Sequence, residues 1–183
     1  MTYTVFPTEI PEVLILESQV FEDNRGFFFE SFNQKDFLLA TGIDLQFVQD
    51  NYSSSVSGVL RGLHYQIEKP QGKLVRVLSG TVFDVAVDLR RSSPNFSKWV
   101  GVELSSENKR QLWIPPGFAH GFLVKTKTAD LQYKTTDYWD PSSERILLWN
   151  DPTIGVKWPT ELEPNLAPKD LIGDSFNNAN FFE

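Results

Sequence analysis

Short β-rich segments separated by turn-forming residues run through most of this sequence, and they constrain its fold more than any other feature. Segments 74–78 and 81–89 show the pattern clearly, because Ser79-Gly80 between them predicts a tight hairpin. Further strands are expected at 13–20, 26–32, 47–53, 59–66, 99–104, 111–114, 121–125, 130–138 and 146–149. Many short strands at this spacing are typical of an antiparallel sandwich or barrel. We therefore predict a mainly β fold, an antiparallel jelly roll with a few short helices.

The clearest strand, 81–89, alternates in polarity with a period of two. Phe83, Val85 and Val87 point to one face, and Asp84 and Asp88 point to the other. This alternation predicts a half-buried strand, with one face packed and the other turned to water or to a cavity.

Helices and domain boundaries are sparse. A helix is expected at 33–41, because Asn33 can cap its first turn and Gly42 can end it. The chain from Trp158 onward is rich in Pro and Asn, which predicts an irregular tail with one short helix near 168–172. No repeat or linker interrupts residues 1–183, so we expect a single domain.

Composition and charge exclude several classes of function. The chain has 17 Lys and Arg against 24 Asp and Glu, a formal net charge of −7, with two His and no Cys. Without Cys it forms no disulfide, thiolate nucleophile or Cys-based metal site. Its acidity predicts no nucleic-acid partner and no membrane partner, since both would need a basic surface. Residues 1–11 lack the pattern of a signal peptide, so we expect a cytoplasmic protein.

Both histidines, His64 and His120, lie at strand positions beside glycines. On a regular strand, His64 shares its face with Gly62 and Gln66, while Arg61 takes the other face unless a bulge at the glycine turns it. Taken alone, each histidine is more often a hydrogen-bonded structural residue than a catalytic one.

The spacing of these histidines resembles the two motifs of the cupin superfamily of jelly rolls, a strand with H-x-H followed by P-x-G-x-x-H. Here the second His of the first motif is Gln66, and no Glu follows four residues later. Cupins that bind a metal use three His and one Glu, a ligand set that suits transition metals. We therefore expect a cupin-like β-barrel with no metal. A metal-dependent cupin such as a dioxygenase remains an alternative.

Seven motifs in order along the chain resemble one family within this superfamily. They are FEDNRGFFFE (21–30), QDN (49–51), LRGLHYQ (60–66), QGKLVRV (71–77), FDVAVDLR (83–90), PPGFAHGF (115–122) and WNDP (149–152). Together they are similar to the dTDP-4-dehydrorhamnose 3,5-epimerases of the rhamnose pathway. The resemblance covers most of the chain.

The resemblance implies an isomerase that inverts C-3 and C-5 of dTDP-4-dehydro-6-deoxy-D-glucose to give dTDP-4-dehydro-L-rhamnose. Both carbons flank the C-4 ketone, so no cofactor is expected. By the family's pattern His64 is the base, Asp170 is its carboxylate partner, and Lys73 lies near the enolate oxygen. Tyr133 corresponds to the tyrosine that donates a proton to the opposite face, and Tyr138 is a competing candidate.

The resemblance also implies substrate-binding residues and a second subunit. Residues matching family contacts to the dTDP-4-ketosugar are Arg25, Glu30, Gln49, Asp50, Asn51, Arg61, Lys73, His120, Tyr138, Glu144 and Lys169. Trp139 stands where the family pattern suggests Tyr. In this family the N-terminal strands cross to a partner, so we expect a homodimer in which Arg25 and Glu30 can serve the neighbour's site.

Two other functions fit the same residues. The first is an epimerase that inverts only C-3 or only C-5, or that acts on another dTDP-4-ketosugar, because the base, oxyanion site and acid would be the same. The second is a non-catalytic jelly roll that binds a sugar nucleotide. The presence of His64, Lys73, Tyr133 and Asp170 together favours an enzyme, since binding alone needs neither a base nor an acid.

Overall fold

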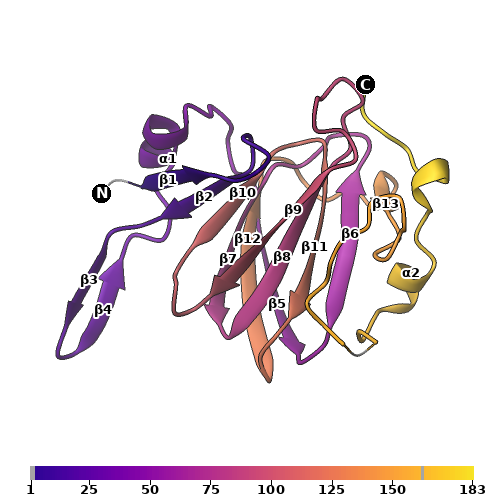
Figure 1. The fold of residues 1–183 in the computed structure, drawn as a ribbon. Helices are drawn as coiled ribbons and strands as arrows, with labels where there is room; N and C mark the ends of the chain where they lie inside the picture. The colour runs from indigo at the N-terminus through magenta and orange to yellow at the C-terminus, as the bar shows by residue number, and fades with distance from the viewer. Residues whose placement is uncertain (1–2, 162) are drawn as a thin grey trace.

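Two antiparallel sheets face each other in the computed structural model, which describes residues 3–161 and 163–183 (Figure 1). Predictions that touch Met1, Thr2 or Leu162 lie outside the described residues. The six-stranded sheet has the order β1 (Thr4–Pro7), β2 (Leu14–Glu17), β10 (Gln111–Ile114), β7 (Lys73–Ser79), β12 (Thr128–Thr135), β5 (Gln49–Val56). The five-stranded sheet has the order β13 (Glu144–Ile146), β6 (Leu60–Gln66), β11 (Phe118–Val124), β8 (Thr81–Asp88), β9 (Trp99–Ser105). The predicted fold class, a mainly β jelly roll, is confirmed.

The predicted hairpin at Ser79-Gly80 is wrong. β7 pairs with β10 and β12, whereas β8 pairs with β11 and β9, so this turn carries the chain from one sheet to the other. Gly80 has φ +76, and a Cβ there would clash with the backbone oxygen of Thr128. The tight turn exists as predicted, but each flanking strand finds its hydrogen-bond partners elsewhere.

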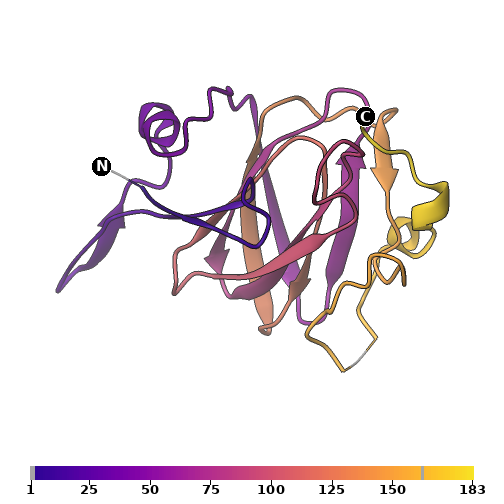
Figure 2. The same cartoon turned by 45° about the horizontal axis from the view of Figure 1, so that its top comes forward.

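Both faces of β8 are covered, so the strand is more deeply buried than its alternation suggests. Val82 and Ala86 point into the core between the sheets. Val85 and Val87 pack on the outer side of the five-stranded sheet. The cover there is Val156 together with the tail predicted as irregular, whose apolar side chains are Trp158, Phe176, Ala179, Phe181 and Phe182. Figure 2 shows this tail, in orange and yellow, along the side of β13 and β6.

The helices are short, as expected. α1 (Gln34–Thr41) is capped by the Asn33 side chain, which accepts hydrogen bonds from two backbone N–H groups of the first turn, and it ends at Gly42 with φ +72. α2 (Pro168–Leu171) and the 3-10 turn η1 (Phe176–Asn178) lie in the tail. No helix in the described part of the chain is long and apolar enough to cross a membrane.

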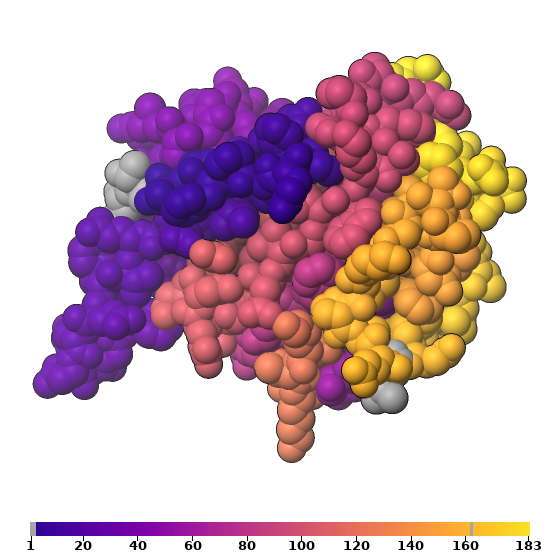
Figure 3. Space-filling model, in the orientation of Figure 1, coloured from indigo at the N-terminus to yellow at the C-terminus, as the bar shows by residue number. Residues whose placement is uncertain are grey.

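The hairpin of β3 (Val20–Asp23) and β4 (Gly26–Phe29), called here the arm, forms its own two-stranded sheet and extends away from the barrel (Figures 1 and 3). Three large aromatic side chains on it are exposed: Phe21, Phe27 and Phe28. The single strand predicted at 13–20 is divided between β2 and β3, and β1 was not predicted.

Candidate active site

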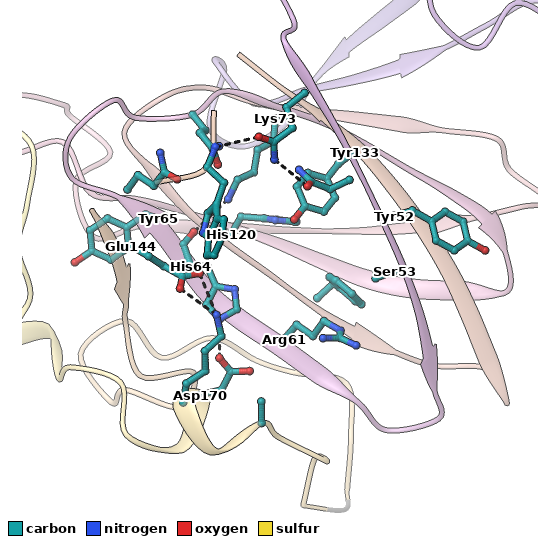
Figure 4. A pocket seen from close by; sticks show the side chains of 18 residues that line it. Tyr52, Ser53, Arg61, His64, Tyr65, Lys73, His120, Tyr133, Glu144 and Asp170 are labelled. Atoms are coloured by element: carbon teal, nitrogen blue, oxygen red, sulfur yellow. Dashed lines mark hydrogen bonds and ion pairs between the residues drawn. The ribbon is translucent and has the colours of Figure 1, made fainter. Parts of the chain in front are cut away.

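A cavity of about 420 Å³ lies between the two sheets and is lined by both of them and by α2 (Figure 4). Strands β5, β7 and β12 supply one wall, and β6, β11 and β13 supply the other. Most of the predicted site residues line it: Gln49, Asn51, Arg61, His64, Lys73, His120, Tyr133, Glu144, Lys169 and Asp170. Residues far apart in sequence therefore meet in one place.

His64 and Asp170 form a close pair at this cavity. His64 Nε2 lies 2.6 Å from Asp170 Oδ1, although the two residues are 106 positions apart. The Asp170 side chain is only 2% exposed, whereas that of His64 is 25% exposed. Because a carboxylate accepts hydrogen bonds, Nε2 carries the proton in the neutral imidazole. The lone pair of Nδ1 is then left to act as a base.

A bulge in β6 brings Arg61 and His64 to the same cavity. His120 of β11 stands opposite His64, and Phe122 stands opposite Arg61, so two residues of β6 face the single Gly121 between them. The bulge contains Gly62, whose φ is +131. A Cβ on Gly62 would lie 2.5 Å from Gly121 Cα, so the two strands meet where neither residue has a side chain. Because of this bulge, the regular alternation of faces along β6 fails between Arg61 and His64. The Arg61 side chain is held by a hydrogen bond from its Nε to Ser55 Oγ at 3.2 Å.

A second carboxylate–imidazole pair, which sequence analysis missed, lies beside the first. His120 Nε2 is 2.9 Å and 3.0 Å from the two carboxylate oxygens of Asp84, and both residues are buried. Burial lowers the pKa of His120, and Asp84 partly opposes that shift. One indication of this pair was present in the sequence: Asp84 lies on the polar face of a β-rich strand, and an acidic side chain that such a strand buries needs a hydrogen-bonding partner.

Lys73 is the buried cation of the site. It begins β7, its side chain is almost fully buried, and its ammonium donates to the backbone oxygen of His64 at 3.3 Å. Burial lowers the pKa of Lys73 to about 8, and Asp84 and Glu144 limit the shift by favouring the charged form. The ammonium is thus mostly charged at neutral pH.

Tyr133, not Tyr138, faces the cavity. Tyr133 lies on β12, and burial together with the charge of Glu144 raises its pKa, while Arg61 acts in the opposite direction. The phenol is therefore protonated at neutral pH. Tyr138 is 63% exposed and does not line the cavity, whereas Trp139 does.

An ion pair joins the tail to β13 at the cavity. Lys169 Nζ lies 3.0 Å and 3.1 Å from the two carboxylate oxygens of Glu144. Lys169 precedes Asp170 on α2, so this pair holds the turn that presents Asp170 to His64.

Gln66, which replaces the second His of the cupin pattern, has a structural role. Its amide nitrogen donates to the backbone oxygens of Lys69 and Tyr138, and its amide oxygen accepts from the backbone N–H of Asp140. Among residues 3–161 and 163–183, no three His, Cys, Asp or Glu side chains come together as possible metal ligands.

Four predicted binding residues lie outside the cavity lining, namely the exposed Tyr138 and three others. Arg25, at the tip of the arm, is largely exposed and pairs with Asp23. Glu30 follows the arm and also lies outside the cavity lining. Asp50 points to the other face of β5, where it pairs with Lys134 at 2.9 Å. Ser53, which was not predicted, also lines the cavity, and its buried Oγ has no hydrogen-bond partner in the described chain.

Comparison with known proteins gives consistent results. Residues 7–178 match the family model described as dTDP-4-dehydrorhamnose 3,5-epimerase. Proteins of that name from Salmonella typhimurium and Pseudomonas aeruginosa are 59% and 58% identical, and each alignment covers at least 94% of both chains. The crystal structure of dTDP-6-deoxy-D-glucose-3,5-epimerase from Legionella pneumophila, in complex with dTDP-4-keto-L-rhamnose, is 51% identical and superposes with a TM-score of 0.95. That match covers 97% of this chain and 95% of the Legionella chain.

Proposed function

Because the chain belongs to the dTDP-4-dehydrorhamnose 3,5-epimerase family, and is thus an isomerase, we propose how its own residues perform the reaction. The reaction inverts C-3 and C-5 of dTDP-4-dehydro-6-deoxy-D-glucose and yields dTDP-4-dehydro-L-rhamnose. Each carbon lies next to the C-4 ketone, so loss of its proton gives an enolate with charge on the C-4 oxygen. The site must therefore supply a base, a stabilising cation and an acid on the opposite face of the ring.

His64 is the base. Its Nδ1 lone pair takes the proton from C-3 or C-5, and the C–H electron pair passes into the enolate. Asp170, 2.6 Å from Nε2, stabilises the imidazolium that results. The dyad also fixes the orientation of the ring, because Asp170 is held in the tail on one side and His64 in β6 on the other.

Lys73 stabilises the enolate oxygen. An ammonium in a buried site interacts strongly with a charge that develops only during the reaction. With a pKa of about 8, Lys73 is mostly protonated at neutral pH and is poised to act in this way.

Tyr133 is the acid on the opposite face. It belongs to the six-stranded sheet, whereas His64 belongs to the five-stranded sheet, so a sugar between them meets the base on one side and the phenol on the other. The raised pKa of Tyr133 keeps its proton available. The phenol donates that proton to the carbon, which completes the inversion, and both groups then exchange protons with solvent. This placement of base and acid on facing walls is the observation that carries the mechanism.

The remaining polar groups bind the nucleotide and the sugar. Arg61 is suited to the diphosphate, because a guanidinium makes paired hydrogen bonds to phosphate oxygens. The Nε2–H group of His120 donates a hydrogen bond to the Asp84 carboxylate, so the neutral ring presents Nδ1 as an acceptor, which suits a sugar hydroxyl. Glu144, Lys169, Gln49 and Asn51 supply further contacts around the cavity.

Deuterium incorporation tests this proposal. The dTDP-4-ketosugar is incubated with the enzyme in D₂O, and label at C-3 and C-5 is read by NMR. We expect label at both carbons; label at only one carbon would instead identify the single-position epimerase. His64→Ala should abolish incorporation while dTDP affinity changes little, and unchanged incorporation would remove His64 as the base.

The active assembly is a homodimer in which the arm of each subunit serves its neighbour. Arg25 and Glu30 lie outside the cavity of their own chain, and the arm exposes three Phe side chains that a second subunit could cover. Mixing Arg25→Ala with His64→Ala protein tests this arrangement, because a mixed dimer then contains one complete site. Recovery of activity on mixing is expected, and its absence would place Arg25 outside the neighbour's site.

Two further expectations concern the surroundings of the enzyme. We place it in the cytoplasm, since a chain without Cys gains nothing from an oxidising compartment. We also treat residues 1–183 as one domain, because strands from both halves of the chain alternate within each large sheet.

A further inference from the structure

Arg76 lies on the face of the six-stranded sheet that points away from the catalytic cavity. Its neighbours along β7, Val75 and Val77, belong to the core between the sheets, so the side chain of Arg76 takes the opposite face. Gln111 of β10 and Gln132 of β12 stand directly opposite Arg76 in the two adjacent strands. The three side chains form a polar row across the middle of the sheet.

The guanidinium of Arg76 is partly buried and lacks an acidic partner. Its Nε and Nη1 atoms are buried and have no hydrogen-bond partner in the part of the chain that the structure describes. Arg76 Cζ lies over the ring of Phe29, 5.8 Å from the ring centroid. Burial lowers the pKa of Arg76, and Tyr3 acts in the opposite direction. A guanidinium cannot give up its proton as a lysine can, so the charge remains and calls for a partner.

A second cavity of about 240 Å³ opens beside this guanidinium. The side chains that line it, on β7, β10, β12 and the segment after β4, include no carboxylate: Ser31, Phe32, Leu74, Arg76, Gln111, Gln132, Tyr133 and Lys134. The ammonium of Lys134 is bonded to Asp50, and the Gln111 amide donates to the backbone oxygen of Ser31. The lining of this cavity therefore offers Arg76 no acidic partner.

We propose that Arg76, with Gln111 and Gln132 beside it, forms an oxyanion-binding site that is separate from the catalytic cavity. A carboxylate or phosphate group provides two acceptor oxygens in the plane that a guanidinium prefers. The Gln132 amide can supply an additional donor, whereas the Gln111 amide already donates to Ser31 and Ser18. Such a group can come from a free anion or from an acidic side chain of a second copy of this chain. The site does not depend on the proposed function.

Thermal unfolding tests the site with inorganic phosphate as the probe. Saturating dTDP is present throughout, so that phosphate does not report on the catalytic cavity. For the wild type, phosphate at ~10 times its dissociation constant should raise Tm by roughly 3–6 °C. Arg76→Met keeps the apolar stem without the charge and should lose this shift. Arg110→Gln is the control, because Arg110 already pairs with Glu17 at 2.8 Å and should leave the shift unchanged.

A dilution series followed by sizing in solution distinguishes the source of the oxyanion. If a second copy supplies the carboxylate, Tm does not respond to phosphate, and Arg76→Met weakens self-association at least ~10-fold while Arg110→Gln does not. Either result supports the site. If Arg76→Met alters neither the phosphate response nor self-association, the proposal is overturned, and Arg76 is simply a buried cation that the fold tolerates.

Discussion

Replacement of Asp170 by Asn isolates the charge of the catalytic carboxylate. The amide is isosteric and can still accept a hydrogen bond from His64 Nε2, so the ring remains in place. What is lost is attraction to the imidazolium. Two unit charges ~4 Å apart at an effective dielectric constant of ~20 interact by about 4 kcal/mol. Because the His64 side chain is 25% exposed, solvent screens part of this interaction. A loss of about 2–4 kcal/mol in transition-state stabilisation corresponds to a kcat roughly 30- to 1000-fold lower.

The assay is the rate of deuterium incorporation at C-3 and C-5 under saturating substrate. KM should change little, since the imidazolium forms only during the reaction. Asp84→Asn is the matched control, because it alters the other carboxylate–imidazole pair. There we expect a smaller loss at pH 7 and a basic limb of the pH profile that moves to lower pH, as Asp84 helps to keep the pKa of Lys73 near 8. A kcat for Asp170→Asn within ~3-fold of the wild type, with Tm preserved, would refute the dyad.

Three other changes give separate readouts. Lys73→Met should lower kcat at least ~100-fold by removing the cation at the enolate oxygen. The same variant should have a higher Tm at pH 7. The pKa of Lys73 in the folded protein, about 8, lies below its ordinary value of 10.5, so the buried ammonium destabilises the folded state at neutral pH. This destabilisation disappears as the pH rises from about 8 to 10.5. For the wild type, activity should fall as pH rises through about 8; a flat profile from pH 7 to 9 would contradict the role of Lys73. Tyr133→Phe should still exchange the C-3 and C-5 protons for deuterium from the His64 face, but with the configuration of the sugar retained. Tyr138→Phe should behave as wild type. Inversion by Tyr133→Phe at an undiminished rate would exclude Tyr133 as the acid. Gly62→Ala should lower Tm by at least ~6 °C and abolish activity, because its Cβ would meet Gly121 in the bulge. Gly26→Ala is the control, because Gly26 has φ +126 against +131 for Gly62 but has open space where a Cβ would lie. An equal loss of Tm in both variants would rule out the close approach of Gly62 to Gly121 as the cause.

Local signals in the sequence predicted local structure well. Asn33 and Gly42 placed α1, and turn residues placed most strands within a few residues of their observed ends. The pairing of strands was not predictable in the same way. A two-residue turn at Ser79-Gly80 is compatible with a hairpin or with a crossing between sheets, and only contacts of β7 and β8 with distant strands decide between them.

The site residues show the same division. His64, Lys73, Tyr133 and Asp170 were identified because they match family motifs, and the structure brings them to one cavity. Asp84 was missed because alternation alone does not say whether a polar face meets water or a buried histidine. The bulge that turns Arg61 into the cavity depends on the close approach of Gly62 to Gly121, which are far apart in sequence. The exposed position of Arg25 likewise depends on the pairing of β3 with β4 in the arm, which the polarity pattern of the segment does not reveal.

The distance in sequence between His64 and Asp170 has a consequence for biosynthesis. At ~5–20 residues per second on the ribosome, the 106 residues that separate them require roughly 5–20 s. During that interval the segment that carries His64 has been synthesised, while its carboxylate partner and part of the tail that covers the five-stranded sheet have not. The same tail thus covers the outer side of this sheet and completes the dyad. The His64–Asp170 pair therefore forms only when the tail packs onto the five-stranded sheet, and a growing chain cannot enolise a sugar before this last step of folding.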